Sequence, residues 1–504
     1  MHISNVVIEF VTRVIQMNDQ FGALDHTYLC NQVLALLGEE DFPIVPEDSA
    51  VSQADTLDLL DTMVDRAVIN QVVEDFQSTR EILESRLMDF MTPPPSQVNQ
   101  QFYKLREQSV EMATDYFYEL SRRNDYIKTR AIAQNIEFSV DTQYGPMEIT
   151  INLSKPEKNS KQILAESQAK SVKYPQCQLC MENEGYLGKV NYPARSNHRV
   201  IRVDLKGDAW GFQYSPYAYF TEHAIFLAQE HRPMSINKQT FANLLYLIEQ
   251  FPHYFIGSNS DLPISGGSIL SHDHYQGGHY DFPMAKASID YSFDLTQWPS
   301  ISAGIVNWPM SVIRLQSQVI EDLVEAADFI YDKWKAYSNE SLSILAYTPD
   351  GVRHHTLTPI ARHNGEAYEL DIVLRDNNTS QEYPDGIFHP HPEVQHIKQE
   401  NIGLIEVMGL AILPPRLKSE LAQVKAFLLE TDHQIADKHL EWAEMIKAKH
   451  QITQDNVDNV IKEEIGHRFA TILEHAGVFK RDKIGVEAFR AFVDGLTLNE
   501  GVNK

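Results

Sequence analysis

The spacing of apolar residues changes twice along this chain, and that order limits the folds open to it. Through about residue 130 apolar side chains recur every three or four positions, as along 3–15, which is typical of amphipathic helices. From about residue 136 they alternate with polar residues, as along 368–374, which indicates half-buried strands. Helical spacing returns after Pro414-Pro415. The order predicts an α+β protein with an antiparallel sheet body and helical ends.

The two changes of period predict four segments. These are a helical N-terminal extension (1–135), a first sheet-containing half that carries the catalytic residues (136–300), a second such half (301–413) and a helical C-terminal region (414–504). The His-x-His units at 272–274 and 389–391 form a weak internal repeat, which indicates that the two halves are related.

Charge and composition exclude several classes of partner. With 43 Lys and Arg against 70 Asp and Glu, the formal charge is −27, so we expect neither nucleic-acid nor anionic-membrane binding. The sequence has no run of about 18 apolar residues, the length that a membrane span requires. Residues 1–5 lack a basic segment followed by an apolar one, and the chain has 3 cysteines. We therefore expect a cytoplasmic protein.

The stretch from Asn259 to His279 carries the strongest chemical signal. If 271–276 is an extended strand, His272, His274 and Gln276 project from one face. Three polar side chains on one face are poor core material, which favours a site. A neutral imidazole attacks phosphorus when its other ring nitrogen is held protonated by an acceptor.

A glycine-containing loop, Ser265-Gly266-Gly267-Ser268, lies just upstream of these residues. Glycines let backbone N–H groups approach phosphate oxygens closely. A nucleophile beside an anion-binding loop predicts nucleotidyl transfer through a covalent intermediate. The alternative interpretation is a structural or incidental His-x-His on a strand.

Cys177 and Cys180 form a Cys-x-x-Cys pair. The pair alone could be redox-active, metal-binding or accidental. With no second pair in the sequence, a tetrahedral zinc site would need two histidines from elsewhere. Cys30 lies in the helical extension, where we expect a core residue.

Four segments together carry a resemblance to a known family. The stretches 192–199, 210–216, 259–279 and 356–362 resemble galactose-1-phosphate uridylyltransferases, within the histidine triad superfamily, and the long helical extension is similar to the class II branch. The resemblance implies a histidine-triad-like sheet body. It also implies that His274 attacks the α-phosphorus of UDP-glucose and releases glucose 1-phosphate, after which galactose 1-phosphate accepts the uridylyl group to give UDP-galactose.

The motif match assigns two catalytic residues. Class I enzymes carry His-Pro-His-Gly-Gln where this chain has His-Asp-His-Tyr-Gln, which places the nucleophile at His274 and the amide at Gln276. Hydrolases of the superfamily carry a third histidine instead of the glutamine. A sugar 1-phosphate leaves without a proton donor, since the second pKa of a phosphate monoester is about 6. An amide that donates to a phosphoryl oxygen then suffices, which favours transfer over hydrolysis.

The resemblance also implies metal ligands. It adds His231 and His272 to Cys177 and Cys180 as a structural zinc site, with His223 as the alternative to His231. Zinc on His272 would position the nucleophile strand. Class I relatives hold iron near a second His-x-His, so we also predict a second metal near His389 and His391; with His396 they could instead be a surface cluster.

Substrate contacts are the last assignment. The substrates are anionic and need cations. The predicted contacts are the glycine-loop residues Gly266, Gly267 and Ser268, and three side chains. The resemblance implies that Asn259 contacts a phosphate or the sugar and that Glu406 binds sugar hydroxyls, and Arg362 is the predicted cation. Arg195, Arg199 and Arg353 are alternative cations. Class I enzymes complete the pocket across a dimer interface, which implies a homodimer here.

Two rival functions stay open on the sequence. A dinucleoside polyphosphate phosphorylase on the same scaffold would share His274 but accept another base and acceptor. A zinc-stabilised, non-catalytic protein would bind sugar nucleotides without turnover.

Overall fold

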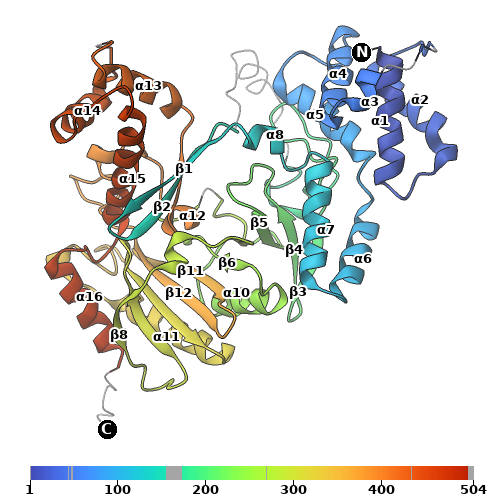
Figure 1. Ribbon diagram of the computed structural model, residues 1–504. Helices are drawn as coiled ribbons and strands as arrows, with labels where there is room; N and C mark the ends of the chain where they lie inside the picture. The colour runs from blue at the N-terminus through green and yellow to red at the C-terminus, as the bar shows by residue number, and fades with distance from the viewer. Residues whose placement is uncertain are drawn as a thin grey trace. The chain divides into compact units, whose positions relative to one another are not determined.

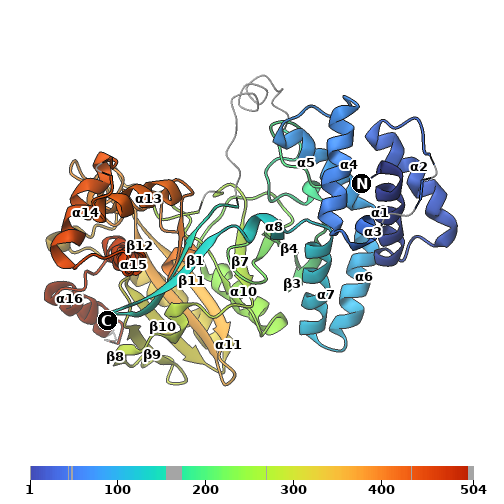
Figure 2. The ribbon, with the colours of Figure 1, turned by 45° about the horizontal axis from the view of Figure 1, so that its top comes forward.

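The computed structural model describes residues 2–43, 45–46, 49–154, 173–267, 269–432 and 434–497 (Figures 1 and 2). The chain forms two compact units. The first unit comprises Met1–Arg130, Lys155–Ala218 and Ala224–His231, and the second comprises Ala131–Ser154, Tyr219–His223 and Arg232–Lys504. Among the described residues, no helix combines the length and the apolar composition that crossing a membrane requires.

The first unit begins with helices that share one apolar core. They are α1 (Ile3–Met17), α2 (His26–Leu37), α3 (Ser49–Gln53), α4 (Thr56–Ile69) and α5 (Gln77–Asp89), drawn in blue in Figure 1. The apolar stripe of α1 is buried along Val6, Phe10 and Val14, as its spacing predicts. The proline run at 93–95 separates two helices, because α5 ends at Asp89 and α6 begins at Pro95, where a missing N–H costs nothing.

The same unit contains three antiparallel strands. They are β3 (Ile201–Leu205), β4 (Asp208–Tyr214) and β5 (Ala224–Ala228), in that order. Two paired helices, α6 (Pro95–Arg106) and α7 (Val110–Arg123), contribute Phe102 and Phe117, whose rings lie 6.1 and 5.3 Å from that of Phe212 on β4. The helical extension and these strands therefore share aromatic packing.

The second unit contains seven strands in the order β7-β6-β11-β12-β10-β9-β8, each antiparallel to its neighbour. Their bounds are β6 (Phe255–Gly257), β7 (His274–Gly278), β8 (Ile289–Phe293), β9 (Ser302–Val306), β10 (Val312–Ser317), β11 (His355–His363) and β12 (Tyr368–Asp376). Helices α10 (Lys238–Gln250) and α11 (Ile320–Ala336) pack against β10, β11 and β12 (Figure 1). The alternation predicted along 368–374 is confirmed as β12.

A smaller sheet and a set of helices complete the second unit. The sheet consists of β1 (Ile136–Thr142), β2 (Gly145–Ile151) and β13 (Leu410–Leu413), of which β13 runs parallel to β2. The helices are α8 (Thr129–Ile132), whose last two residues belong to this unit, and then α12 (Leu404–Val407), α13 (Leu417–Leu428), α14 (Asp437–Lys449), α15 (Val457–Ala476) and α16 (Lys483–Gly495). Helix α15 packs on β1 and β2, and α13 packs on α14 and α15. The α+β class with antiparallel sheet and helical ends is confirmed.

The strand predicted at 271–276 exists, but the predicted first residue is wrong. Strand β7 begins at His274, so His272 lies in a bend before it and not on the strand face shared by His274 and Gln276. The reason is local hydrogen bonding. The N–H of Asp273 donates to the carbonyl oxygen of Arg232 at 2.7 Å, so this segment bonds to the loop after His231. The proline that class I enzymes carry at this position has no N–H to donate.

A buried ion cluster joins three strands of the second unit. Arg314 on β10 and Asp371 on β12 are cross-strand partners, and Arg314 Nε donates to Asp371 Oδ1 at 2.7 Å. Arg362 on β11 donates to Asp371 Oδ2 at 2.7 Å and also contacts Glu369. Burial raises the pKa of Asp371, but the guanidinium groups of Arg362 and Arg314 outweigh it, so the pKa lies below its usual value.

We expect Asp371→Asn to lower the free energy of unfolding by about 3 kcal/mol, because it removes a fully buried carboxylate to which Arg314 and Arg362 both donate. The measurement is urea denaturation at pH 7. Asp332→Asn is the control, since the pair of Asp332 with Lys335 is exposed, and it should change stability by less than about 1 kcal/mol. Because the folded-state pKa is lowered, the difference between wild type and Asp371→Asn should shrink as the pH falls through that pKa. Equal stability of both variants at pH 7 would contradict this account.

Candidate active site

The predicted nucleophile, His274, is the first residue of β7 and is buried. Its Nδ1 lies 2.7 Å from the carbonyl oxygen of His272. A carbonyl oxygen only accepts hydrogen bonds, so Nδ1 carries the proton and donates it, and Nε2 bears the lone pair. The bend before the strand therefore supplies the acceptor that a nucleophilic imidazole needs.

The charge state of His274 also suits attack. Burial lowers the pKa of His274 to about 4, against the opposing effect of the hydrogen bond to His272. The ring is therefore neutral near pH 7. A neutral imidazole with its proton held on Nδ1 and its lone pair on Nε2 is chemically able to displace a leaving group at phosphorus.

Gln276 lies two residues further along β7, on the same face as His274 by strand alternation. Its Oε1 is 2.9 Å from Nε2 of the buried His223. The structure therefore pairs His223, which the sequence left as an alternative zinc ligand, with Gln276. As a partner of Gln276 it was missed, because no motif marks a contact across 53 positions.

The glycine loop packs against Asn259, which follows β6, the neighbour of β7. A Cβ on Gly267 would lie 2.8 Å from Nδ2 of Asn259, so a side chain at 267 would have to displace that amide. The Oδ1 of Asn259 accepts from the N–H of Leu404, the first residue of α12, at 2.9 Å. Gly266 forms an isolated parallel β-bridge with Ser260. Ser268, the last predicted loop contact, lies outside the described residues.

Glu406 lies on α12, the helix whose first residue, Leu404, bonds to Asn259. Its carboxylate accepts from the N–H of Gly403 at 3.2 Å and pairs with Nζ of Lys398 at 3.0 Å. Arg375, fully buried, donates to the carbonyl oxygen of Ile402 at 2.8 Å. Burial lowers the pKa of Arg375 to about 10, and the charge of Glu406 opposes this shift. Sequence reasoning missed both cations, since nothing local distinguishes them from surface Lys or Arg.

The predicted phosphate-binding arginine, Arg362, is engaged with Asp371 and Glu369. It lines a cavity of about 130 Å³ in the second unit together with His253, His279 and His363. Neither His274 nor Gln276 lines this cavity. A role of Arg362 in substrate binding stays a prediction.

The alternative arginines also have partners within the chain. Arg199 donates to Asp89 at 2.8 Å, and Arg353 donates to Asp261 at 2.9 Å. The guanidinium of Arg195 lies 5.6 Å from the centre of the Tyr126 ring. Intramolecular contacts thus account for each of these three side chains.

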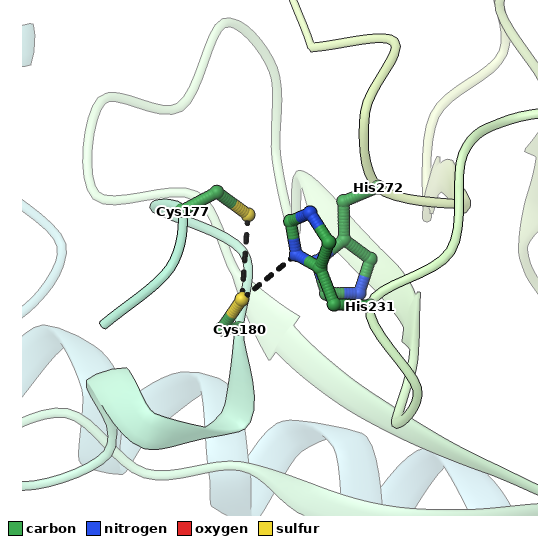
Figure 3. Close-up of side chains that lie close together, drawn as sticks. All are labelled: Cys177, Cys180, His231 and His272. Carbon is green, nitrogen blue, oxygen red and sulfur yellow. Dashed lines mark hydrogen bonds between the residues drawn. The ribbon is translucent and has the colours of Figure 1, made fainter. Parts of the chain in front are cut away.

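Cys177, Cys180, His231 and His272 are a group that could hold a metal ion, and Figure 3 draws their side chains. Within the first unit, the sulfur atoms of Cys177 and Cys180 are 3.5 Å apart, and Cys180 Sγ is 3.2 Å from His231 Nδ1. Zinc–ligand bonds of about 2.1–2.3 Å at tetrahedral angles place neighbouring ligands about 3.4–3.8 Å apart. The donor set suits zinc, the two sulfur atoms have that spacing, and the group contains His231 rather than His223.

The three histidines predicted near the second metal site each contact a different residue. His391 groups with Glu393 and His475, and its ring stacks on that of His475 at 4.3 Å and 20°. His389 bonds instead to Asn401 at 3.3 Å. His396 lies 3.0 Å from His439 between their Nδ1 atoms. Lone pairs of stacked rings run side by side, which is poor geometry for one shared ion.

The fold and the site together define an α+β protein with a buried, neutral imidazole arranged as a nucleophile. Two family models match the chain, namely galactose-1-phosphate uridyl transferase, N-terminal domain, over residues 19–233, and the C-terminal domain over residues 247–444. The chain belongs to the galactose-1-phosphate uridylyltransferase family.

Curated relatives match over nearly their whole length. The galactose-1-phosphate uridylyltransferase of Enterococcus faecalis is 56% identical over 97% of this chain and 98% of its own. That of Lactiplantibacillus plantarum is 57% identical over 96% and 98%. Among solved structures, yeast Ap4A phosphorylase Apa2 in complex with Ap4A aligns at a TM-score of 0.38 and 11% identity, over 73% of this chain and 97% of that chain. That likeness is too low to bear on the phosphorylase alternative.

We expect Gly267→Ala to lower kcat/KM for uridylyl transfer by about tenfold to a hundredfold, because its Cβ must displace the Asn259 amide. Steady-state kinetics measure this effect. Gly495→Ala, where a Cβ meets nothing within 4 Å, is the matched control and should behave as wild type. Full activity of Gly267→Ala would show that the packing of Asn259 on the loop is not needed for the reaction.

Proposed function

We propose that the chain transfers the uridylyl group of UDP-glucose to galactose 1-phosphate through a uridylyl-histidine at His274. The observation that carries this proposal is the hydrogen bond from Nδ1 of His274 to the carbonyl oxygen of His272, which leaves Nε2 free to attack. The names of the curated relatives support uridylyl transfer and galactose 1-phosphate as the acceptor.

The first half-reaction forms the covalent intermediate. Nε2 of His274 attacks the α-phosphorus of UDP-glucose, the N–P bond forms, and the bond to the bridging oxygen breaks. Glucose 1-phosphate takes the electron pair and leaves without a proton, since its second pKa is about 6. Positive charge develops on the imidazole, and the Nδ1–H bond to the His272 carbonyl stabilises it.

The second half-reaction reverses these steps with a new nucleophile. A phosphate oxygen of galactose 1-phosphate attacks the same phosphorus, the N–P bond breaks, and His274 recovers its lone pair. UDP-galactose is the product. The amide of Gln276 donates to a phosphoryl oxygen in both halves and steadies the charge that builds there.

The remaining predicted contacts complete the proposal. Backbone N–H groups of Gly266, Gly267 and Ser268 bind phosphate oxygens, and Asn259 fixes that loop by packing on Gly267. Glu406 reads sugar hydroxyls, held in place by Lys398. Arg362 would bind a substrate phosphate if that phosphate replaced Glu369 or Asp371 as its partner.

Zinc is proposed at Cys177, Cys180, His231 and His272, with a positional role. The donor set and the spacing of the first three ligands support it. A ligand bond to His272 would restrain the residue whose carbonyl oxygen holds Nδ1 of His274. A second metal near His389 and His391 has less support, because their rings make separate contacts.

The wider setting follows from the family resemblance and composition. We propose a cytoplasmic homodimer that works on UDP-glucose and galactose 1-phosphate, with no nucleic-acid or membrane partner. The net charge of −27 supports the last point. The four segments 1–135, 136–300, 301–413 and 414–504 remain the proposed division by function.

Incubation with UDP-glucose alone should add one uridylyl group to the wild-type chain, as measured by intact mass. His274→Ala should show no adduct, because it lacks the nucleophilic nitrogen. His467→Ala, which changes an exposed histidine, should be labelled as wild type. Binding without an adduct in the wild type would favour the non-catalytic alternative, and an adenylyl adduct from a dinucleoside polyphosphate would favour the phosphorylase.

Elemental analysis of the purified protein should find about one zinc per chain, with loss in Cys177→Ser and His231→Ala, because a structural site needs all four ligands. Cys30→Ser is the matched control and should keep its zinc, since Cys30 lies in the core of the helices. His391→Ala tests the second metal through the total metal content. Equal zinc in all variants would remove Cys177 and His231 from the site.

A further inference from the structure

We propose that His223 is a positioning residue that orients the side-chain amide of Gln276 so that its NH₂ group faces the reacting phosphorus. His223 lies in the segment between β4 and β5, outside the active-site motif. The inference rests on the proposed function, in which Gln276 donates to a phosphoryl oxygen. It assigns the partner that makes this donation the favoured orientation.

The hydrogen bonds of His223 determine which of its nitrogens carries the proton. Its Nδ1 lies 3.4 Å from the backbone N–H of Tyr219, and an N–H can only donate, so Nδ1 accepts. Burial lowers the pKa of His223 to about 4, so the ring carries one proton, which is then on Nε2. Nε2 lies 2.9 Å from Oε1 of Gln276 and donates to it.

This donation decides the direction of a side chain that is otherwise ambiguous. A carboxamide has an accepting oxygen and a donating NH₂ group on opposite sides, and a rotation of about 180° exchanges them. Because His223 occupies the oxygen, the NH₂ group is directed to the other side. A phosphoryl oxygen only accepts, so the reverse orientation would set the amide oxygen against negative charge.

The fold holds His223 firmly enough to act in this way. Its ring stacks on that of Phe220 at 4.5 Å and 28°, and the side chain is buried. The neighbouring segment passes close to β7, because a Cβ on Gly278 would lie only 2.5 Å from the carbonyl oxygen of Glu222. Glycine at 278 thus permits the backbone approach that brings His223 within reach of Gln276.

The test is a double-mutant cycle on the rate of uridylylation, measured in single turnovers with UDP-glucose. His223→Phe keeps a buried ring but cannot donate, and it should lower the maximal rate by about tenfold to a hundredfold, with little change in the UDP-glucose concentration that gives half of that rate. Gln276→Ala should lower it by about a hundredfold or more. In the Gln276→Ala background, His223→Phe should cause no further loss, since its effect passes through the amide.

Two further variants separate positioning from folding. His223→Gln keeps a donor at the end of its side chain and should recover most of the rate. His354→Phe removes a different buried histidine, one that bonds to the carbonyl oxygen of Leu345, and should leave the rate unchanged. The thermal midpoints of all variants show whether each one folds.

The outcomes are distinct. Additive losses in the double variant, or an unchanged rate in a folded His223→Phe, would overturn the positioning role while the wild-type adduct still forms. Absence of the adduct in the wild type would instead overturn the proposed function.

Discussion

The hydrogen bond from Nδ1 of His274 to the carbonyl oxygen of His272 is the interaction on which the proposed chemistry depends. It fixes the tautomer, exposes Nε2 as the nucleophile and offers an acceptor for the charge that develops during attack. A carbonyl oxygen in a regular strand is directed to a neighbouring strand. The bend at His272 releases it for this role, so the proposed chemistry depends on the irregular start of β7.

The bend is in turn held from several directions. The N–H of Asp273 donates to the carbonyl oxygen of Arg232, and Arg232 Nε pairs with the carboxylate of Asp273 at 3.3 Å. His272 belongs to the group proposed to bind zinc. A metal at that position would stiffen the carbonyl group that accepts from Nδ1 of His274, which is the positional role proposed for it.

Much of the site consists of neutral groups whose direction matters more than their charge. Gln276 and Asn259 each use the oxygen of a side-chain amide to contact protein, which directs the NH₂ group to the other side. Such groups add no net charge to a chain whose formal charge is −27. The cations Lys398 and Arg375 lie with Glu406 and α12, where their charges are partly balanced.

The sequence alone determined the local features of this protein. Apolar spacing predicted the helix α1 and the strand β12, and the motif at 272–276 made His274 and Gln276 the candidate catalytic residues, because period and motif are properties of neighbouring residues. The sequence also predicted a set of zinc ligands. The Cys-x-x-Cys spacing indicated Cys177 and Cys180, and the family resemblance added His231 and His272. Only the tertiary structure decided that β7 starts at His274, that His223 binds Gln276 and that His475 joins His391. These contacts join residues far apart in the chain, and their formation depends on which backbone groups and side chains the folded sheet brings within hydrogen-bonding distance.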